Sequence, residues 1–181
     1  MRTPDYGRAI LADVEFNEDT AAPFTDEEIE RWVKFDDPDA AAVASEVTDL
    51  AQEMLSCSIS ERTVIAEFES YAAATKLPYG PVQEIDEVVQ LNQGDENPIT
   101  GYHLRGDTIY FAGSTGADHP YYRAGLRVTY TAGYKTIPAG LKSGLRQAIA
   151  TALSDRQDNV LGGVSEISSN SRKKLLKWRR Y

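Results

Sequence analysis

The last ten residues of the chain hold the side chains best suited to binding chemistry. Six cations and two aromatic rings fall within residues 172–181. Such a mixture can grip phosphates, stack on bases or dock on an acidic protein surface. The ten residues are Arg172, Lys173, Lys174, Leu175, Leu176, Lys177, Trp178, Arg179, Arg180 and Tyr181.

Three interpretations of this basic segment follow from its composition. Cations with interleaved aromatic rings indicate nucleic-acid binding. Lysines and arginines at a helix end also complement the helix dipole while remaining solvated. In the third interpretation, Leu175, Leu176 and Trp178 enter an acidic-rimmed groove on a protein partner. A short terminal segment without a core of its own favours docking.

Signals for catalysis or metal binding are scarce. Asp118 and His119 form a pair, but no third ligand stands at a helical or Cys-x-x-Cys spacing from them. Residues 113–116 (Gly-Ser-Thr-Gly) lack the Gly-Lys-Ser/Thr ending of a phosphate-binding loop, and no Gly-x-Ser-x-Gly elbow occurs. Residues 105–107 (Arg-Gly-Asp) are best explained as a tight turn. The sequence therefore predicts no enzyme activity, no metal site and no cofactor.

Charge is distributed unevenly along the 181 residues. The net charge is −9 overall, but residues 1–100 carry −17, residues 101–164 carry +3 and residues 165–181 carry +5. The acidic total argues against a general binder of nucleic acid or anionic membranes. An acidic front and a basic end can attract copies of the same chain head to tail, or a partner at one end.

Other features of the sequence bear on the cellular compartment of the protein. Cys57 is the only cysteine, which excludes an internal disulfide and predicts a small core residue. No apolar run approaches the ~18 residues of a membrane span, and the N-terminus lacks the apolar stretch of a signal peptide. The sequence predicts a soluble protein that stays in the cell, or in something assembled there.

The first predicted helix covers about residues 26–35. Thr25 and Glu28 have the spacing of a capping box, in which each side chain satisfies a backbone amide of the other residue. Phe24 and Ile29 stand where a hydrophobic staple would place them. These four residues predict the start of the helix.

Two longer helices are predicted at 38–56 and 139–160. Asp37 is the expected N-cap of the former, with Pro38 at the first helical position, while Pro138 opens the latter. Both helices repeat apolar residues at spacings of 4, 3, 1, 3 and 1, so we expect them to pack together. The repeated residues are Val43, Val47, Leu50, Ala51, Met54 and Leu55, and Leu141, Leu145, Ala148, Ile149, Ala152 and Leu153.

The middle of the chain lacks a helical stripe and favours strands. Ile85, Val89 and Leu91 share a parity, which predicts a strand with one buried face. Residues 77–82 and 92–98 are expected turns. Strands are expected at 59–71, near 99–104 and 108–112, and at 126–131 with Gly133 closing the last.

These elements predict an α+β fold in which a small antiparallel sheet is inserted between helices near 26–35, 38–56 and 139–160. Residues 1–24 are an expected N-terminal arm. Residues 25–163 form the expected core, with a central β region at 59–134. Residues 164–181 form the basic tail, whose short helix Asn170 or Ser171 would cap.

Three stretches of the sequence, at residues 77–82, 127–134 and 174–181, resemble the head–tail connector (adaptor) family of tailed phages, the ring proteins below the portal. Residues 77–82 (Leu-Pro-Tyr-Gly-Pro-Val) look like the family's turn before a strand. Residues 127–134 (Arg-Val-Thr-Tyr-Thr-Ala-Gly-Tyr), followed by Ile137-Pro138, are similar to its most recognisable stretch. The ending at 174–181 also resembles that of the family. Residues 154–157 depart from the family pattern, and residues 1–37 have no counterpart in it.

The resemblance implies a structural, non-enzymatic virion protein of the neck, assembled in the host cytoplasm. Such proteins form a ring, typically of twelve copies, that joins the portal to the stopper or tail while DNA passes through. The tail, residues 172–181, would dock on the portal, so its removal should leave the fold intact. An acidic lumen would make only transient, non-specific contact with DNA. The expected ring-packing core is Val43, Val47, Leu50, Met54, Leu141, Leu145, Ile149 and Leu153.

The alternative is an accessory protein that binds nucleic acid through the basic C-terminal segment.

Overall fold

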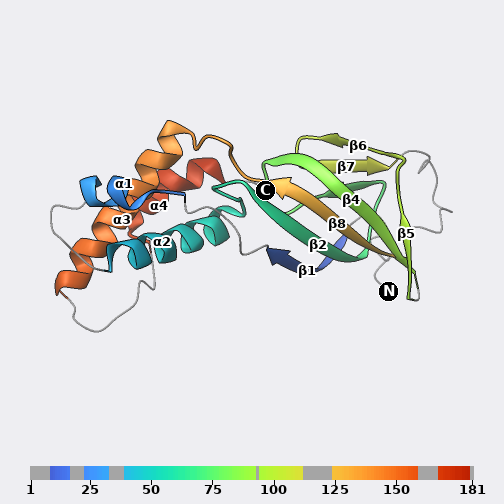
Figure 1. Ribbon diagram of the computed structural model, residues 1–181, viewed down its shortest axis with the longest axis horizontal. Coiled ribbons are helices and arrows are strands. Elements are labelled where there is room, and N and C mark those ends of the chain that lie inside the picture. Colours follow the sequence, from blue (N-terminus) through green and yellow to red (C-terminus); the bar gives the residue numbers. More distant parts are fainter. Residues whose placement is uncertain are drawn as a thin grey trace, which may run out of the picture. The chain divides into compact units, whose positions relative to one another are not determined.

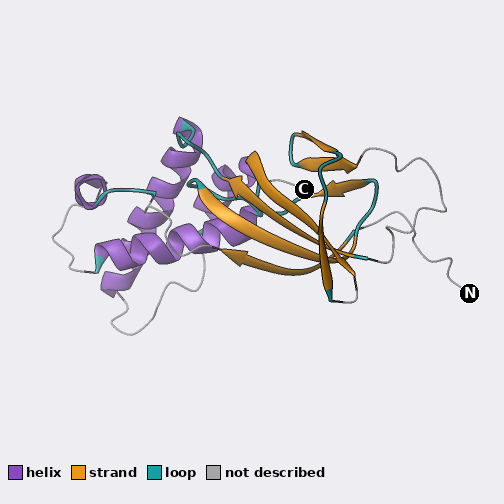
Figure 2. Ribbon diagram, turned by 45° about the vertical axis from the view of Figure 1, so that its right-hand side comes forward, coloured by secondary structure: helices purple, strands orange, loops and turns teal. Residues whose placement is uncertain are grey.

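The computed structural model of the protein describes residues 9–16, 23–32, 39–92, 94–111, 124–158 and 167–179. The chain folds into two compact units: Met1–Asp19 with Glu61–Gly133, and Thr20–Ser60 with Tyr134–Tyr181. All described strands belong to the first, here called the sheet unit, and all described helices to the second, the helical unit (Figure 2). The α+β prediction is confirmed.

The sheet unit is larger than the sequence predicts. Instead of one small inserted sheet, it contains a five-stranded sheet in the order β1-β2-β8-β4-β5 and a three-stranded sheet in the order β3-β7-β6, all antiparallel (Figure 1). The strands are β1 (Ile10–Phe16), β2 (Arg62–Ser70), β3 (Ala74–Lys76), β4 (Val82–Asn92), β5 (Asp95–Pro98), β6 (Tyr102–Arg105), β7 (Thr108–Phe111) and β8 (Gly125–Ala132).

Three of these strands were not expected. β1 lies in the predicted N-terminal arm, and β5 lies in the predicted turn 92–98. Both are edge strands, and an edge strand pairs on one side only, so β5 can consist of polar residues and hold Pro98. β3 has only three residues, too few to show a pattern.

Strand β8 organises the sheet unit because its side chains alternate strictly between two faces. Its even-numbered residues Leu126, Val128, Tyr130 and Ala132 are fully buried, whereas the odd-numbered ones are partly exposed. Paired residues of antiparallel strands point to the same face. The partners of the even positions in β2 are therefore also inward, and Val64, Ala66 and Phe68 are indeed buried.

In strand β4, the prediction that Ile85, Val89 and Leu91 share one face is wrong. The register against β8 shifts between Val82 and Glu84 and again between Ile85 and Glu87. Each shift inserts an extra residue, as a β-bulge does. Val82, Ile85 and Val88, three residues apart, consequently pack in the same cluster, whereas Val89 pairs with Arg127 on the opposite face.

The expected turn at 77–82 is present and is held by hydrogen bonds. The Tyr130 hydroxyl donates to the Pro78 carbonyl, and the Val82 amide donates to Asp107 Oδ1 at 3.0 Å. Burial, followed by the charge of Asp107, raises the pKa of Tyr130, so this hydroxyl keeps its proton as a donor. A Cβ at Gly80 would lie 2.5 Å from the Asp107 carboxylate, so a larger residue there would displace the acceptor of the Val82 amide.

The helical unit contains the three predicted helices with adjusted ends. They are α1 (Asp26–Trp32), α2 (Ala40–Leu55) and α3 (Ala139–Asp158), followed by α4 (Ser169–Leu175) and a 3₁₀ turn η2 (Leu176–Trp178). Asp39 rather than Asp37 stands at the N-cap of α2. Residues 33–38, including Asp36, Asp37 and Pro38, lie outside the described residues, as do Gly162 and Gly163.

The core of the helical unit confirms that α2 and α3 pack together. Val43, Val47, Ala51 and Leu55 of α2 are at most 1% exposed, and they share a cluster with the apolar stripe of α3. Leu50 and Met54 are only partly buried. Cys57 is fully buried, as expected, and Ile59 belongs to this core rather than to a strand.

On the outer side of the five-stranded sheet, Arg127 bridges two strands that are not its neighbours in sequence. Its Nε contacts Glu67 Oε1 on β2 at 2.6 Å, and its Nη1 contacts Glu96 Oε1 on β5 at 2.8 Å. These hydrogen bonds raise the pKa of Arg127. Because Glu67 also stands opposite Asp13 of β1, the guanidinium offsets a repulsion between like charges.

We therefore expect Arg127→Met to loosen the sheet edges. The loss of two partly exposed ion pairs should cost about 1 kcal/mol, which corresponds to about fivefold faster amide exchange in β8 and β5. Hydrogen exchange followed by mass spectrometry measures this. Lys135→Met, at an exposed position of the helical unit, is the control and should leave exchange unchanged; equal effects of the two variants would contradict the assignment.

Candidate docking segment and charged faces

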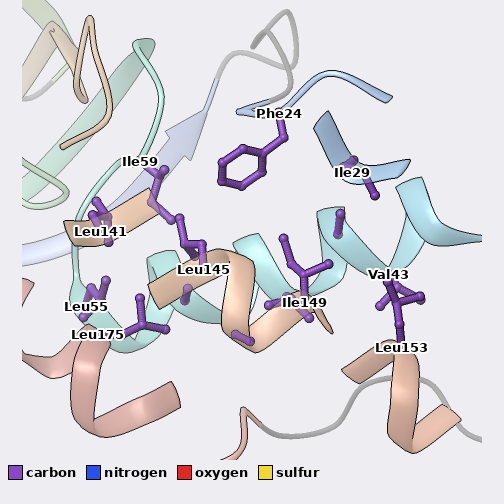
Figure 3. Close-up of a cluster of buried hydrophobic side chains, with 14 of the residues drawn as sticks. Phe24, Ile29, Val43, Leu55, Ile59, Leu141, Leu145, Ile149, Leu153 and Leu175 are labelled. Carbon is purple, nitrogen blue, oxygen red and sulfur yellow. The ribbon is translucent and has the colours of Figure 1, made fainter. Parts of the chain in front are cut away.

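The C-terminal segment, residues 167–179, folds onto the helical unit instead of standing alone. Leu175 is fully buried, in one cluster with Leu55, Leu141 and Leu145 (Figure 3). Trp178 is partly buried and packs on the same cluster. The sequence treats this segment as a tail without a core, but α4 completes the core of its own unit.

Two glycines of α3 make room for the segment. A Cβ at Gly144 would lie 2.8 Å from Leu175 Cδ2, and a Cβ at Gly140 would lie 3.1 Å from Trp178 Cζ2. The absence of both side chains lets α4 and η2 approach α3 closely. The four-residue spacing places both glycines on one face of the helix.

The start of α4 differs from the expected one. Ser168 is the N-cap, and its carbonyl accepts from the Arg172 amide at 2.9 Å. Asn170 and Ser171, the expected caps, lie inside the helix. Ser171 is fully buried, and its hydroxyl is 3.0 Å from that of Ser168, so burial rather than capping explains this residue.

The polar side of the segment is exposed and basic. Arg172, Lys173, Lys174, Lys177 and Arg179 are exposed, and Lys174 donates to Gln147 of α3. Leu176 is 38% exposed, so it is an apolar side chain of this segment that a partner could cover. Arg180 and Tyr181 lie outside the described residues. Trp178 is partly buried against its own unit, which reduces the ring surface that a base could stack on.

The expected ring-packing residues divide into two groups. Val43, Val47, Leu141, Leu145, Ile149 and Leu153 are at most 1% exposed inside the helical unit, so they hold α2 and α3 together. Leu50 and Met54 retain exposed surface. A contact between subunits through these helices would thus use Leu50, Met54 and the polar positions; such a contact stays a prediction.

Helix α1 is fastened to α3 by one ion pair and aromatic contacts. Lys142 Nζ contacts Glu28 Oε1 at 2.5 Å, which holds the pKa of Glu28 below its usual value. The Arg146 guanidinium lies 5.9 Å from the ring centre of Trp32, which packs edge-on against Phe24. The Glu28 amide is 3.2 Å from Thr25 Oγ1, which confirms this half of the predicted capping box.

The structure describes only part of the remaining chemical candidates. His103 is exposed on β6 and stacks on Tyr110 at 5.1 Å, while residues 105–107 form the β6–β7 turn with Gly106 at φ +61°. Asp118, His119 and residues 113–116 lie outside the described residues. Across the described part of the chain, no three His, Cys, Asp or Glu side chains are grouped as metal ligands. No described helix has the length and apolarity that a membrane span requires.

A charged face that sequence reasoning missed lies on the outer side of the five-stranded sheet. The register of β1, β2, β4, β5 and β8 brings eight carboxylates onto this side, with Arg127 as the cation among them. We call this the acidic face; its carboxylates are Asp13, Glu15, Glu67, Glu69, Glu84, Asp86, Glu87 and Glu96. In the sequence, this face is indicated only by the alternation of side chains in β2. In β4, the two bulges interrupt that alternation.

No family model matches the sequence, and none of the curated proteins does. Solved structures do match. A chain from the neck of an empty gene transfer agent particle, determined with C6 symmetry, superposes with a TM-score of 0.72 at 13% identity, covering 94% of this chain and 96% of that one. The fold is shared with neck chains of gene transfer agent particles.

Two further structures agree. A chain from the virion of a native gene transfer agent particle gives a TM-score of 0.69 at 16% identity, over 92% of this chain and 95% of that one. A chain from the neck of a native particle, determined with C12 symmetry, gives 0.66 at 17% identity, over 92% and 96%. At such low identity, the shared property is the fold across nearly the whole chain.

The burial of Leu175 predicts a large difference between two adjacent leucines. Leu175→Ala removes a fully buried side chain and should lower the free energy of unfolding of the helical unit by about 2–5 kcal/mol. Leu176→Ala, at an exposed position, should change it by less than about 1 kcal/mol. Both tryptophans belong to the helical unit, so tryptophan fluorescence in urea reports on this unit. Equal effects would mean that α4 is not part of the core.

The Glu28–Lys142 pair predicts a pH dependence with a definite sign. Because the folded pKa of Glu28 lies below the reference value of 4.5, the pair stabilises the fold above about pH 4.5 and loses this effect as pH falls through the folded pKa. Glu28→Gln should therefore be less stable than wild type at pH 7 and equal to it in acid. Glu30→Gln, at an exposed position of α1, should follow wild type throughout.

Proposed function

We propose that the protein is a structural subunit of the neck of a tailed-phage-like particle, an adaptor ring that joins the portal to the stopper or tail while DNA passes through. The observation that carries the proposal is the fold match to neck chains over 92–94% of the sequence. The sequence motifs at 77–82 and 127–134, which resemble those of connector proteins, also support it. The structural role implies no catalysis.

The same comparisons support a ring. Two of the matching necks were determined with C6 and with C12 symmetry. Closed rings are built by one surface of each subunit meeting a different surface of the next. A ring of twelve copies of this chain is compatible with both symmetries, since twelve is a multiple of six.

The C-terminal segment is the proposed contact with the portal. Its exposed cations and Leu176 offer a basic, partly apolar surface that fits an acidic-rimmed groove. Residues 172–179 act from the surface of the helical unit in this proposal, because Leu175 and Trp178 are engaged in its core.

Exposed cations allow portal binding to be tested without harming the fold. Lys173→Glu with Lys177→Glu should reduce co-purification with portal at least tenfold, because two attractive charges become repulsive, while tryptophan fluorescence in urea stays as in wild type. The control is Lys135→Glu, a single charge reversal at an exposed position elsewhere in the helical unit. It is compared with Lys173→Glu alone and with Lys177→Glu alone. Deleting residues 172–181 is a poorer test, since it also removes Leu175.

The outcomes separate the candidate functions. Undiminished portal binding by Lys173→Glu/Lys177→Glu would overturn the proposed docking surface. Absence of the wild-type chain from particle necks would overturn the function itself. A mobility shift of DNA by the wild-type chain with a steep salt dependence would favour the nucleic-acid-binding alternative.

A further inference from the structure

The sheet unit carries opposite charges on the outer sides of its two sheets. The five-stranded sheet presents the acidic face defined above. The three-stranded sheet presents a small basic face, defined here as Lys76, His103, Arg105, Thr108 and Tyr110. Lys76, His103 and Arg105 are exposed, and no Asp or Glu of β3, β6 or β7 accompanies them.

The register of the small sheet establishes which side its charges occupy. Thr75, Ile109 and Leu104 are paired across β3, β7 and β6, and the first two are fully buried. The next row, Lys76 with Thr108 and Arg105, must therefore point outward. The two cations stand on either side of Thr108.

The acidic and basic faces lie on opposite sides of the unit, because the inner sides of both sheets meet in one core. Ile109 of the small sheet belongs to the same buried cluster as Val64, Val128 and Tyr130 of the large sheet. Each sheet therefore turns its polar side away from the other.

The acidic face is costly for an isolated subunit. Asp13 stands directly opposite Glu67, and Glu84, Asp86 and Glu87 follow one another within four residues. Like charges placed this closely destabilise a sheet, and Arg127 compensates only Glu67 and Glu96. A cationic partner on this face would relieve the repulsion.

We propose that the acidic face of one copy contacts the basic face of the next copy in the ring, so that the sheet units make the heterologous contact that closes it. This inference rests on the proposed function and names the surfaces of its subunit contact. Two different faces on opposite sides of one unit are what a ring requires. Both faces belong to the sheet unit, which leaves the basic C-terminal segment available for the portal.

The edge strand β1 exposes apolar side chains on the side opposite its own carboxylates, since Ile10, Leu11 and Phe16 pair with inward-facing positions of β2. Ile10, Leu11 and Phe16 are 54%, 45% and 38% exposed, and Leu176 is the one other large apolar side chain this exposed among the described residues. Asp13 and Glu15 of the same strand pair with Glu67 and Ile65 and point to the acidic face. These apolar side chains are therefore not part of the acidic face.

Cross-linking between two single-cysteine variants tests the contact directly. Glu87→Cys and Arg105→Cys replace exposed residues of the acidic and the basic face, while the native Cys57 is buried. With a short bis-maleimide at low salt, each variant alone should remain uncross-linked, and their mixture should give a covalent dimer. The variant that carries both substitutions should give a ladder of multimers. Glu53→Cys mixed with Arg105→Cys is the control and should give no dimer.

A charge-reversal pair gives an independent readout of the same contact. Lys76→Glu/Arg105→Glu makes both faces acidic, and lysine at Glu15, Glu69, Glu84 and Glu87 makes the acidic face basic. Each variant alone should need at least tenfold more protein to associate than wild type, measured by light scattering, and their mixture should recover. Glu30→Lys/Glu53→Lys, on exposed positions of the helical unit, should associate as wild type does.

Three results would overturn the inference. They are a cross-linked dimer of Glu87→Cys with itself, no cross-link in the mixture, or association of the reversed variants at the wild-type concentration. Portal binding by the wild-type chain combined with any of these results would refute this contact and leave the proposed function standing. Cross-linking should also weaken in about 0.5 M salt, which screens exposed charges within a few ångströms.

Discussion

The alternation of strand β8 is the constraint on which the sheet unit depends. Because Leu126, Val128, Tyr130 and Ala132 are fully buried, the register of β2 and β4 against them decides which of their side chains enter the core. It also sends Arg127 and the threonines of β8 outward, among the carboxylates of the neighbouring strands. One period-two pattern in the central strand therefore fixes both the packing and the surface charge of the unit.

In the helical unit, close approach between helices has the corresponding role. Gly140 and Gly144 remove two side chains from one face of α3, and Leu175 and Trp178 occupy the space. The C-terminal segment thereby gains a fixed place, with its cations exposed. A basic segment held in this way meets a partner with little loss of conformational entropy, which favours binding.

The predictions from sequence were most accurate for elements whose pattern depends on residues close together in the chain. The apolar stripes of α2 and α3, the start of α1, and the burial of Cys57 follow from local periodicity and capping, and all are confirmed. They failed where pairing partners decide the conformation. β1 and β5 are edge strands, and the bulges of β4 turn Val88 into the core cluster of the sheet unit while Val89 is buried on the opposite face.

The sequence alone determined the helix pattern, the division of charge along the chain and the motifs that resemble connector proteins, because these depend on neighbouring residues only. The tertiary structure decided the rest. Strand register gathers the dispersed carboxylates on one outer face and places Lys76 and Arg105 on the other. Packing against α3 turns Leu175 from an expected docking residue into a core residue. Both outcomes depend on contacts between residues far apart in the chain, which local patterns do not encode.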